Sequence, residues 1–209
     1  MGHRVCIAAV LGMCAAGASA QTAASRAVEP LRIPSLQVFG GMSWPLAKPG
    51  LTEFWRSGPA AAVGFSVPVS RRASLGLEVG VAAYWFRASH FADVYPGVSV
   101  RNLPIAHTTI MIVGRFDLMR GKRLGPYAGL SLGVAKASDA VYREIVDSVR
   151  TTYFAVPGRT RLAGGLTAGL EYVVNKKTSI DGEARLLGVA NDQAISTTLT
   201  MRCGVRFTF

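Results

Sequence analysis

The chain has 209 residues, of which 50% are hydrophobic, and carries a formal net charge of +11. Its length suits a single domain after any targeting segment is removed. Beyond residue 20, no segment approaches the roughly 18 uninterrupted apolar residues of a membrane-spanning helix, so the sequence argues against a helical membrane protein. The apolar residues are instead spread along the whole chain.

The first 20 residues read as a targeting segment. Arg4 supplies a positive charge, residues 5–18 are mainly apolar, and residues 18–20 form an Ala-Ser-Ala cleavage motif. This order predicts a secretory signal peptide over residues 1–20. Residues 21–33 show no periodic pattern and are expected to form a short periplasmic leader.

The cysteines bear on processing and on stability. A lipoprotein would place Cys14 at the new N-terminus, but Met13 is bulkier than the residue that usually precedes a lipidated cysteine. Cys6 and Cys14 both lie in the predicted signal, which leaves Cys203 alone in the mature chain. We therefore expect no internal disulfide.

From residue 34 to the end, apolar and non-apolar residues alternate with the period of a β-strand. The alternating segments are each about ten residues long, which is the length that a tilted strand needs to cross a bilayer. The sequence therefore predicts an all-β fold, an eight-stranded antiparallel up-and-down transmembrane β-barrel over residues 34–209. The predicted strands span residues 35–43, 60–69, 73–86, 108–118, 126–136, 161–173, 178–189 and 197–209.

The connections between these strands alternate in length. Short basic turns occupy residues 70–72, 119–123 and 174–177. This pattern is typical of a barrel with both termini on the side of the short turns and long loops opposite. The third long connection contains DAVYREIVDSV, which fits either a short helix or a strand that extends above the membrane. The longer connections are residues 44–59, 87–107, 137–160 and 190–196.

Alternation alone leaves open which face of the barrel points inward. A soluble, lipocalin-like barrel would turn its apolar face inward around a ligand, whereas a membrane barrel turns it outward to lipid. Eight strands leave an interior only just wide enough for side chains, and the non-apolar face is rich in glycine, alanine and serine. We therefore predict that this face lines the lumen, with a network of charged residues: Glu78, Arg115, Asp117, Glu171, Asp181, Glu183, Arg185, Arg202 and Arg206.

Simple hairpin registers bring some of these charges together. They place Glu171 beside Asp181 and Glu183 beside Arg202. A buried charge costs several kcal/mol unless it is paired, and arginine is suited to bidentate pairing with carboxylates. A ladder of carboxylates and guanidinium groups is therefore expected along the lumen.

Aromatic residues lie near both ends of the predicted strands. A membrane barrel carries aromatic girdles at the two membrane–water interfaces. The residues expected to form the girdles are Trp44 and Trp85 at the loop ends, and Phe116, Tyr172, Phe207 and Phe209 at the turn ends.

The last nine residues, MRCGVRFTF, alternate strictly and end in Phe209. This pattern resembles the C-terminal signature of bacterial outer-membrane barrels. Together with the signal peptide, the eight strands and the loop asymmetry, it resembles the small outer-membrane β-barrel family typified by the OmpA barrel domain and OmpX. The resemblance implies location in the outer membrane and recognition of the final strand by the outer-membrane assembly machinery. No peptidoglycan-binding domain of the kind that follows the OmpA barrel is expected.

The candidate catalytic residues are few. His90 has Ser89 beside it and Asp93 nearby, but such a set recurs by chance in polar loops. His107 is followed by two threonines, whereas the outer-membrane deacylases place a serine two residues from the histidine. We therefore predict no catalytic residues, no metal site and no cofactor.

The function expected from the sequence is that of an outer-membrane barrel with a plugged, charge-paired lumen and a structural or surface-interaction role. The expected partners are outer-membrane lipids, lipopolysaccharide and an unknown ligand at the long loops. Nucleic acid is not expected, because the basic excess of an exported barrel fits anionic membrane surroundings. The alternatives are a channel for small solutes and, less favoured, an enzyme that modifies lipid A.

Overall fold

The structure is a computed structural model. It describes residues 33–46, 55–87, 89, 93, 105–119, 123–146, 150–156, 158–190 and 195–209, and within residues 140–156 it describes the backbone alone. Residues Ile33–Phe209 belong to one compact unit. The predicted signal peptide and the leader up to residue 32 lie outside the described residues.

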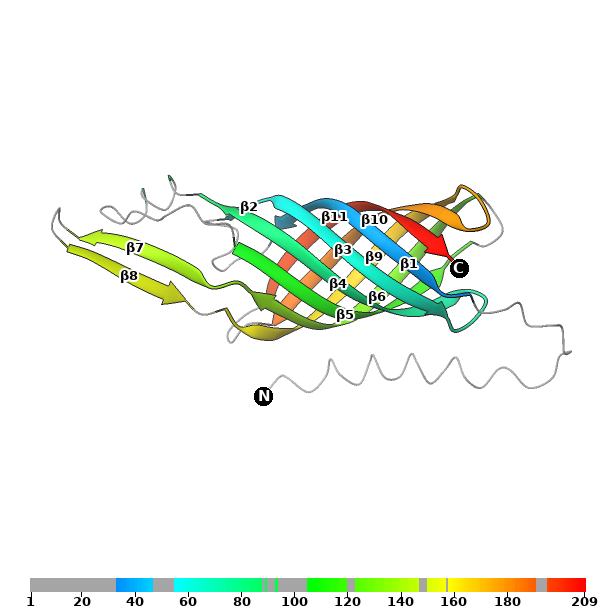
Figure 1. Cartoon of the computed structure of the whole chain (residues 1–209), viewed down its shortest axis with the longest axis horizontal. Coiled ribbons are helices and arrows are strands. Elements are labelled where there is room, and N and C mark those ends of the chain that lie inside the picture. Colours follow the sequence, from blue (N-terminus) through cyan, green and yellow to red (C-terminus); the bar gives the residue numbers. More distant parts are fainter. Residues whose placement is uncertain are drawn as a thin grey trace, which may run out of the picture. The chain divides into compact units, whose positions relative to one another are not determined.

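Eight long strands make up the fold, as predicted, and each overlaps one of the predicted segments (Figure 1). No helix among the described residues is long and apolar enough to cross a membrane. The long strands are β1 (Ser35–Pro45), β3 (Gly58–Pro68), β4 (Ala73–Phe86), β5 (Ile105–Asp117), β6 (Leu124–Ala137), β9 (Thr160–Val173), β10 (Thr178–Ala190) and β11 (Ile195–Thr208).

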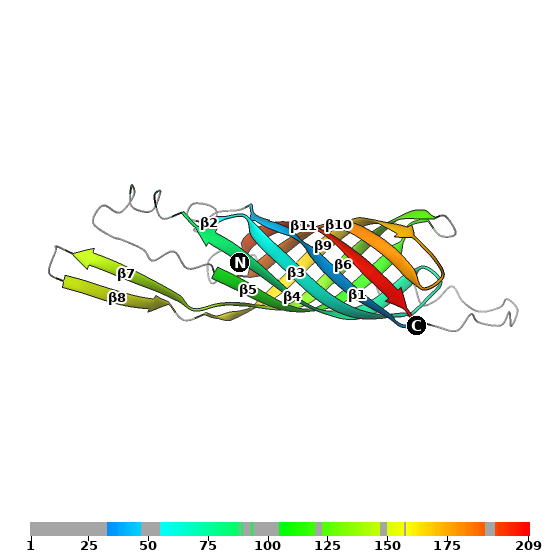
Figure 2. The same cartoon turned by 45° about the horizontal axis from the view of Figure 1, so that its top comes forward.

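The sheet closes on itself, so the antiparallel barrel predicted from the sequence is confirmed. Each long strand pairs with two neighbours in the circular order β4, β3, β1, β11, β10, β9, β6 and β5, and β5 pairs again with β4. The last strand, β11, lies between β1 and β10, and Phe207 is paired with Leu36. Figure 2 shows β1 and β11 side by side. Closure pairs the backbone groups of the terminal strand, which hydrocarbon surroundings require.

Among the described residues of the connections, three further strands are present. The short strand β2 (Trp55–Arg56) pairs with β4. The strands β7 (Ala140–Val146) and β8 (Arg150–Val156) form a separate two-stranded sheet, so the strand interpretation of DAVYREIVDSV is correct and the helix interpretation is wrong. The connection between β10 and β11, residues 191–194, is as short as the turns, so the predicted length asymmetry holds for the first three long connections alone.

The apolar faces of the strands point outward. Leu77, Ile112 and Leu166 are 53%, 58% and 57% exposed, although they lie near the middle of their strands. A soluble protein rarely exposes a contiguous apolar surface of this kind, so the lipocalin-like alternative is wrong. The outward-facing apolar side chains form a belt around the barrel that suits a hydrocarbon environment instead.

The inward face is less uniformly small and polar than the sequence suggested. Met111 is fully buried and packs with Ala135, Ala163 and Val189 along the wall formed by β5, β6, β9 and β10. Val113 and Leu187 pack against this group. The lumen therefore combines charged layers with an apolar wall.

Candidate functional site: the barrel lumen

The nine predicted lumen charges lie in two groups along the barrel. One group, here called the central layer, contains Glu78, Glu183, Arg185 and Arg202. The other group lies nearer the short turns and is here called the turn-side layer. It contains Arg115, Asp117, Glu171, Asp181 and Arg206.

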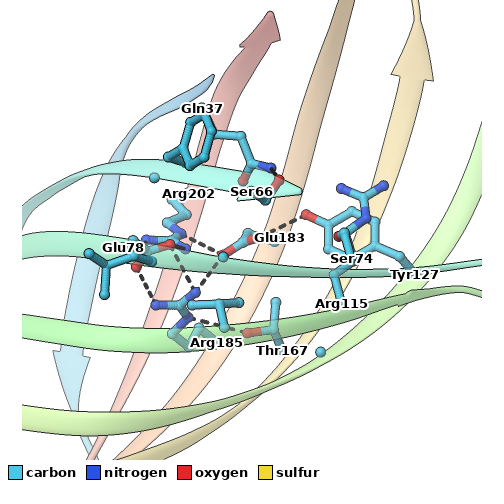
Figure 3. A pocket seen from close by; sticks show the side chains of 16 residues that line it. Gln37, Ser66, Ser74, Glu78, Arg115, Tyr127, Thr167, Glu183, Arg185 and Arg202 are labelled. Carbon is cyan, nitrogen blue, oxygen red and sulfur yellow. Dashed lines mark hydrogen bonds and ion pairs between the residues drawn. The ribbon is translucent and has the colours of Figure 1, made fainter. Parts of the chain in front are cut away.

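Glu78 is the centre of the central layer, where two guanidinium groups meet it (Figure 3). Arg185 donates to Glu78 Oε1 at 2.5 Å and to Oε2 at 3.1 Å. Arg202 donates to the same two oxygens at 3.0 Å and 2.5 Å. Both arginines therefore pair with Glu78 in the bidentate geometry that makes ion pairs strong and specific.

Glu183 completes the central layer. It accepts a hydrogen bond from Arg202 Nε at 2.5 Å through one oxygen and from the Tyr127 hydroxyl at 2.8 Å through the other. The Nε of Arg185 donates to the Thr167 hydroxyl at 3.2 Å. The buried charges of this layer are thus hydrogen-bonded as well as paired, which buried ions need.

The central layer crosses the lumen rather than following one wall. In the circular strand order, β4 and β10 are four strands apart in either direction, so they lie on opposite walls. Glu78 is on β4 and Arg185 is on β10. Their ion pair therefore spans the barrel interior.

The turn-side layer is built around Arg115. Its guanidinium group donates to Asp117 at 2.8 Å, to Asp181 at 3.1 Å and also to Glu171. Arg206 donates to Glu171 at 3.4 Å and to Asp181 at 3.2 Å. Two arginines are therefore shared among three carboxylates.

Charge balance follows from this arrangement. The central layer holds two acids and two bases, and the turn-side layer holds three acids and two bases. The side chain of Asp117 is 32% exposed, whereas that of Asp181 is completely buried. The one unmatched negative charge can therefore be solvated through Asp117 at the edge of the lumen, where it costs less than in the interior.

Two small cavities lie on either side of the central layer. The first has a volume of about 30 Å³ and touches Arg115 and Tyr127, toward the turn-side layer. The second has a volume of about 40 Å³ and touches Tyr84, His107 and Thr198, toward the loops. Both cavities touch Glu78, Arg185 and Arg202, so the central layer separates them.

Two inward aromatic rings support the arginines. The Arg115 guanidinium carbon lies 3.7 Å from the Tyr127 ring centroid, and that of Arg202 lies 4.2 Å from the Phe39 ring centroid. These are cation–π contacts, which stabilise a cation held against a ring face. On the neighbouring strand, the register partner of Tyr127 is Gly169, and that of Phe39 is Gly204.

We expect Gly169→Ala to destabilise the barrel. A Cβ atom at this position would lie 2.4 Å from Cζ of Tyr127, so the ring would have to move and its hydrogen bond to Glu183 would weaken. Overpacking of this kind lowers the free energy of unfolding by about 1–3 kcal/mol. Urea unfolding of the refolded protein, followed by tryptophan fluorescence, measures the change.

Gly182→Ala is the matched control, because a Cβ atom there would have no heavy atom within 4 Å. We expect its free energy of unfolding to stay close to that of the wild type. Equal losses in the two variants would contradict the role given to the Tyr127–Gly169 contact.

An aromatic cap lies at the loop end of the lumen, formed by Trp55, Tyr84 and Phe86. The ring centroids of Trp55 and Phe86 are 5.0 Å apart in an edge-to-face arrangement. The hydroxyl of Tyr84, which is 1% exposed, is hydrogen-bonded to that of Ser43 at 2.8 Å. The cap therefore joins β1, β2 and β4 across one part of the barrel mouth.

The sequence interpretation missed this cap. Tyr84 and Phe86 continue the inward alternation of residues 74–82, so that periodicity could have revealed them. Trp55 could not be placed in this way, because three residues, 57–59, lie opposite two residues of β4 between the pairs Arg56–Trp85 and Ala60–Ala82. This β-bulge reverses the alternation and turns Trp55 inward.

The predicted girdle residues lie at the two ends of the outward face. Trp44 is half-buried near the loop end of β1, and Trp85 is exposed near that of β4. The turn-end residues Phe116, Tyr172, Phe207 and Phe209 are all exposed. Rings in these positions suit a membrane–water interface.

The structure describes one of the two histidines considered as candidate catalytic residues. His90 lies outside the described residues. His107 packs edge-to-face against Tyr84, with ring centroids 5.3 Å apart. Within the described residues, no group of three histidine, cysteine or acidic side chains is arranged to hold a metal ion.

Comparison with known proteins gives matches in structure alone. No family model matches the sequence, and no curated protein matches it. Neisserial surface protein A has a TM-score of 0.57 at 13% identity, over 84% of this chain and 97% of its own. The fold is that of the small outer-membrane β-barrels.

Two further solved structures agree with this assignment. Ail of Yersinia pestis, solved in complex with the heparin analogue sucrose octasulfate, has a TM-score of 0.53 at 13% identity, over 86% of this chain and 100% of its own. A major outer-membrane protein of Thermus thermophilus has a TM-score of 0.52 at 12% identity, over 84% of this chain and 99% of its own. The resemblance drawn from the sequence is thus confirmed for the fold.

Proposed function

We propose that the chain is an integral outer-membrane protein with a closed lumen, serving a structural or surface-interaction role rather than transport or catalysis. The observation that carries this proposal is the ion pair between Glu78 and Arg185, which joins opposite walls of the barrel. Arg202 reinforces it from β11. A solute passing along the barrel would have to break this layer.

The rest of the lumen supports closure. The turn-side layer lies on one side of the central layer, and the aromatic cap lies toward the loops on the other side. The cavities of about 30 and 40 Å³ have room for only a few water molecules each, since a cavity needs about 10–15 Å³ to hold one. An eight-stranded barrel is also too narrow to leave an open channel once side chains fill it.

The outer surface supports insertion into the outer membrane. Its exposed apolar belt is bounded at both strand ends by the girdle residues, as membrane barrels require. The final strand β11 carries the outward residues Met201, Cys203, Val205 and Phe207. We assign to this strand recognition by the outer-membrane assembly machinery.

Surface interaction would take place at the loop end. The third connection forms the β7–β8 hairpin, and an isolated two-stranded sheet gains stability when it packs against something else. The outward residues Arg56 and Lys136 lie at the same end of the barrel and are exposed. We assign them to contact with lipopolysaccharide phosphates, and we assign the hairpin to an external ligand.

Liposome swelling tests the closed lumen. We expect vesicles that contain the folded protein to swell no faster in a small sugar than empty vesicles, because the central layer blocks the path. A large porin in the same vesicles serves as the positive control, and a heat-induced gel shift verifies folding. Measurable sugar flux through the wild type would overturn the closed lumen and favour the channel alternative.

A further inference from the structure

The short-turn end of the barrel carries a concentration of positive charge on its surface. The residues concerned lie in or beside the three short turns and are all exposed. None of the turn residues that the structure describes, 69–72, 118–119, 123 and 174–177, is acidic. We call this set the basic collar: Arg71, Arg72, Arg123, Lys176 and Lys177.

Backbone hydrogen bonds join residues of the basic collar to neighbouring strands. In three of its residues the backbone carbonyl accepts a hydrogen bond from an amide of a neighbouring strand, which fixes the backbone from which each cation projects. The same residues are therefore held at the rim of the closed sheet. The bonds run from Asp117 N to Arg72 O at 2.8 Å, from Val173 N to Arg123 O at 2.7 Å, and from Thr208 N to Lys177 O at 2.8 Å.

Exposed apolar side chains accompany the cations in the same turns. Val69, Leu118 and Val174 are 45%, 50% and 51% exposed. The outward aromatic residues Phe116 and Tyr172 lie a few positions earlier along their strands. Aromatic belts lie at headgroup depth, so the collar lies at or just beyond the depth of the lipid phosphates.

We propose that the basic collar binds the phosphate groups of anionic phospholipids in the leaflet that meets the short turns. This inference rests on the proposed membrane insertion, and it adds a lipid class and a location to it. Arginine holds phosphate through two parallel hydrogen bonds, whereas lysine acts as a point charge. A cation close to an anionic membrane surface favours binding about fivefold, so the several cations of the collar select anionic lipid over neutral lipid.

Lipid retention in nanodiscs tests the proposal. The probe is phosphatidylglycerol, present as a minority lipid in phosphatidylcholine, and native mass spectrometry counts the lipids that remain bound to the protein. We expect the wild type to retain phosphatidylglycerol at least about fivefold above its bulk share. The collar variant R72Q/R123Q/K177Q is expected to retain it at the bulk share.

The matched control keeps the three positive charges and changes only the side chains that carry them. The charge-conserving variant R72K/R123K/K177R is expected to keep the phosphatidylglycerol excess, which separates loss of charge from damage to the turns. Retention of the full excess by the collar variant, or loss of the excess in the charge-conserving variant, would overturn the proposal.

The remaining outcomes separate the two proposals from each other. If the wild type failed to insert into pure phosphatidylcholine, the proposed membrane function would fail. If it inserted and retained the two lipids in their bulk ratio, the collar assignment alone would fail. If inorganic phosphate abolished the phosphatidylglycerol excess at an ionic strength at which sodium chloride left it unchanged, the collar would be a site for a soluble anion and the lipid assignment would be wrong.

Discussion

Replacing Glu78 with methionine is expected to destabilise the barrel more than any other single change considered. The carboxylate accepts four hydrogen bonds from Arg185 and Arg202, and all three side chains are at most 6% exposed. Without it, Arg202 keeps Glu183, but the nearest carboxylate oxygen to Arg185 is 3.8 Å away. Removing one partner of a buried ion pair costs about 3–5 kcal/mol, which urea unfolding in phosphatidylcholine vesicles measures.

A second variant separates the lost charge from lost packing. The double variant E78M/R185M removes one acid and one base and leaves the Glu183–Arg202 pair balanced, with Arg202 Nε 2.5 Å from Glu183. Because no unpaired arginine then remains, we expect it to be more stable than E78M alone. A double variant that loses the full sum of the two single losses would show that the ion pair is not the source of the effect.

Much of this lumen could be predicted from alternation alone. A period-two pattern fixes which residues share a face, and simple hairpins fix which residues are neighbours. The predicted pairs Glu171–Asp181 and Glu183–Arg202 are indeed register partners. Adjacent-strand contacts are local in sequence, which is why they could be derived.

Contacts across the barrel could not be derived in the same way. The pairing of Glu78 with Arg185 depends on the curvature of the closed sheet, which places β4 opposite β10, and on the reach of the arginine. The role of Tyr127 likewise depends on its ring lying against Gly169 on the next strand. Sequence periodicity predicts neither the diameter of the barrel nor the orientation of an aromatic side chain inside it.

Placing an arginine on the outward face tests the orientation on which the membrane assignment depends. Ile112 lies near the middle of β5, with Leu77 and Leu132 as its register partners. We expect Ile112→Arg to lower the free energy of unfolding in phosphatidylcholine vesicles by about 2–4 kcal/mol, as for a cation at the bilayer midplane. Urea titration of the folded, heat-modifiable form measures this loss.

Thr108→Arg is the matched control, because Thr108 lies on the same face of the same strand, four residues nearer the loops. Four residues correspond to about 13 Å of strand, which brings the new cation toward the interface, where the cost falls to about 0–1 kcal/mol. One of the two register partners of Thr108 is already a cation, Lys136, and the other is Val81. In water the two arginines would be equivalent, so an equal effect of both substitutions would show that the outward apolar belt does not face hydrocarbon.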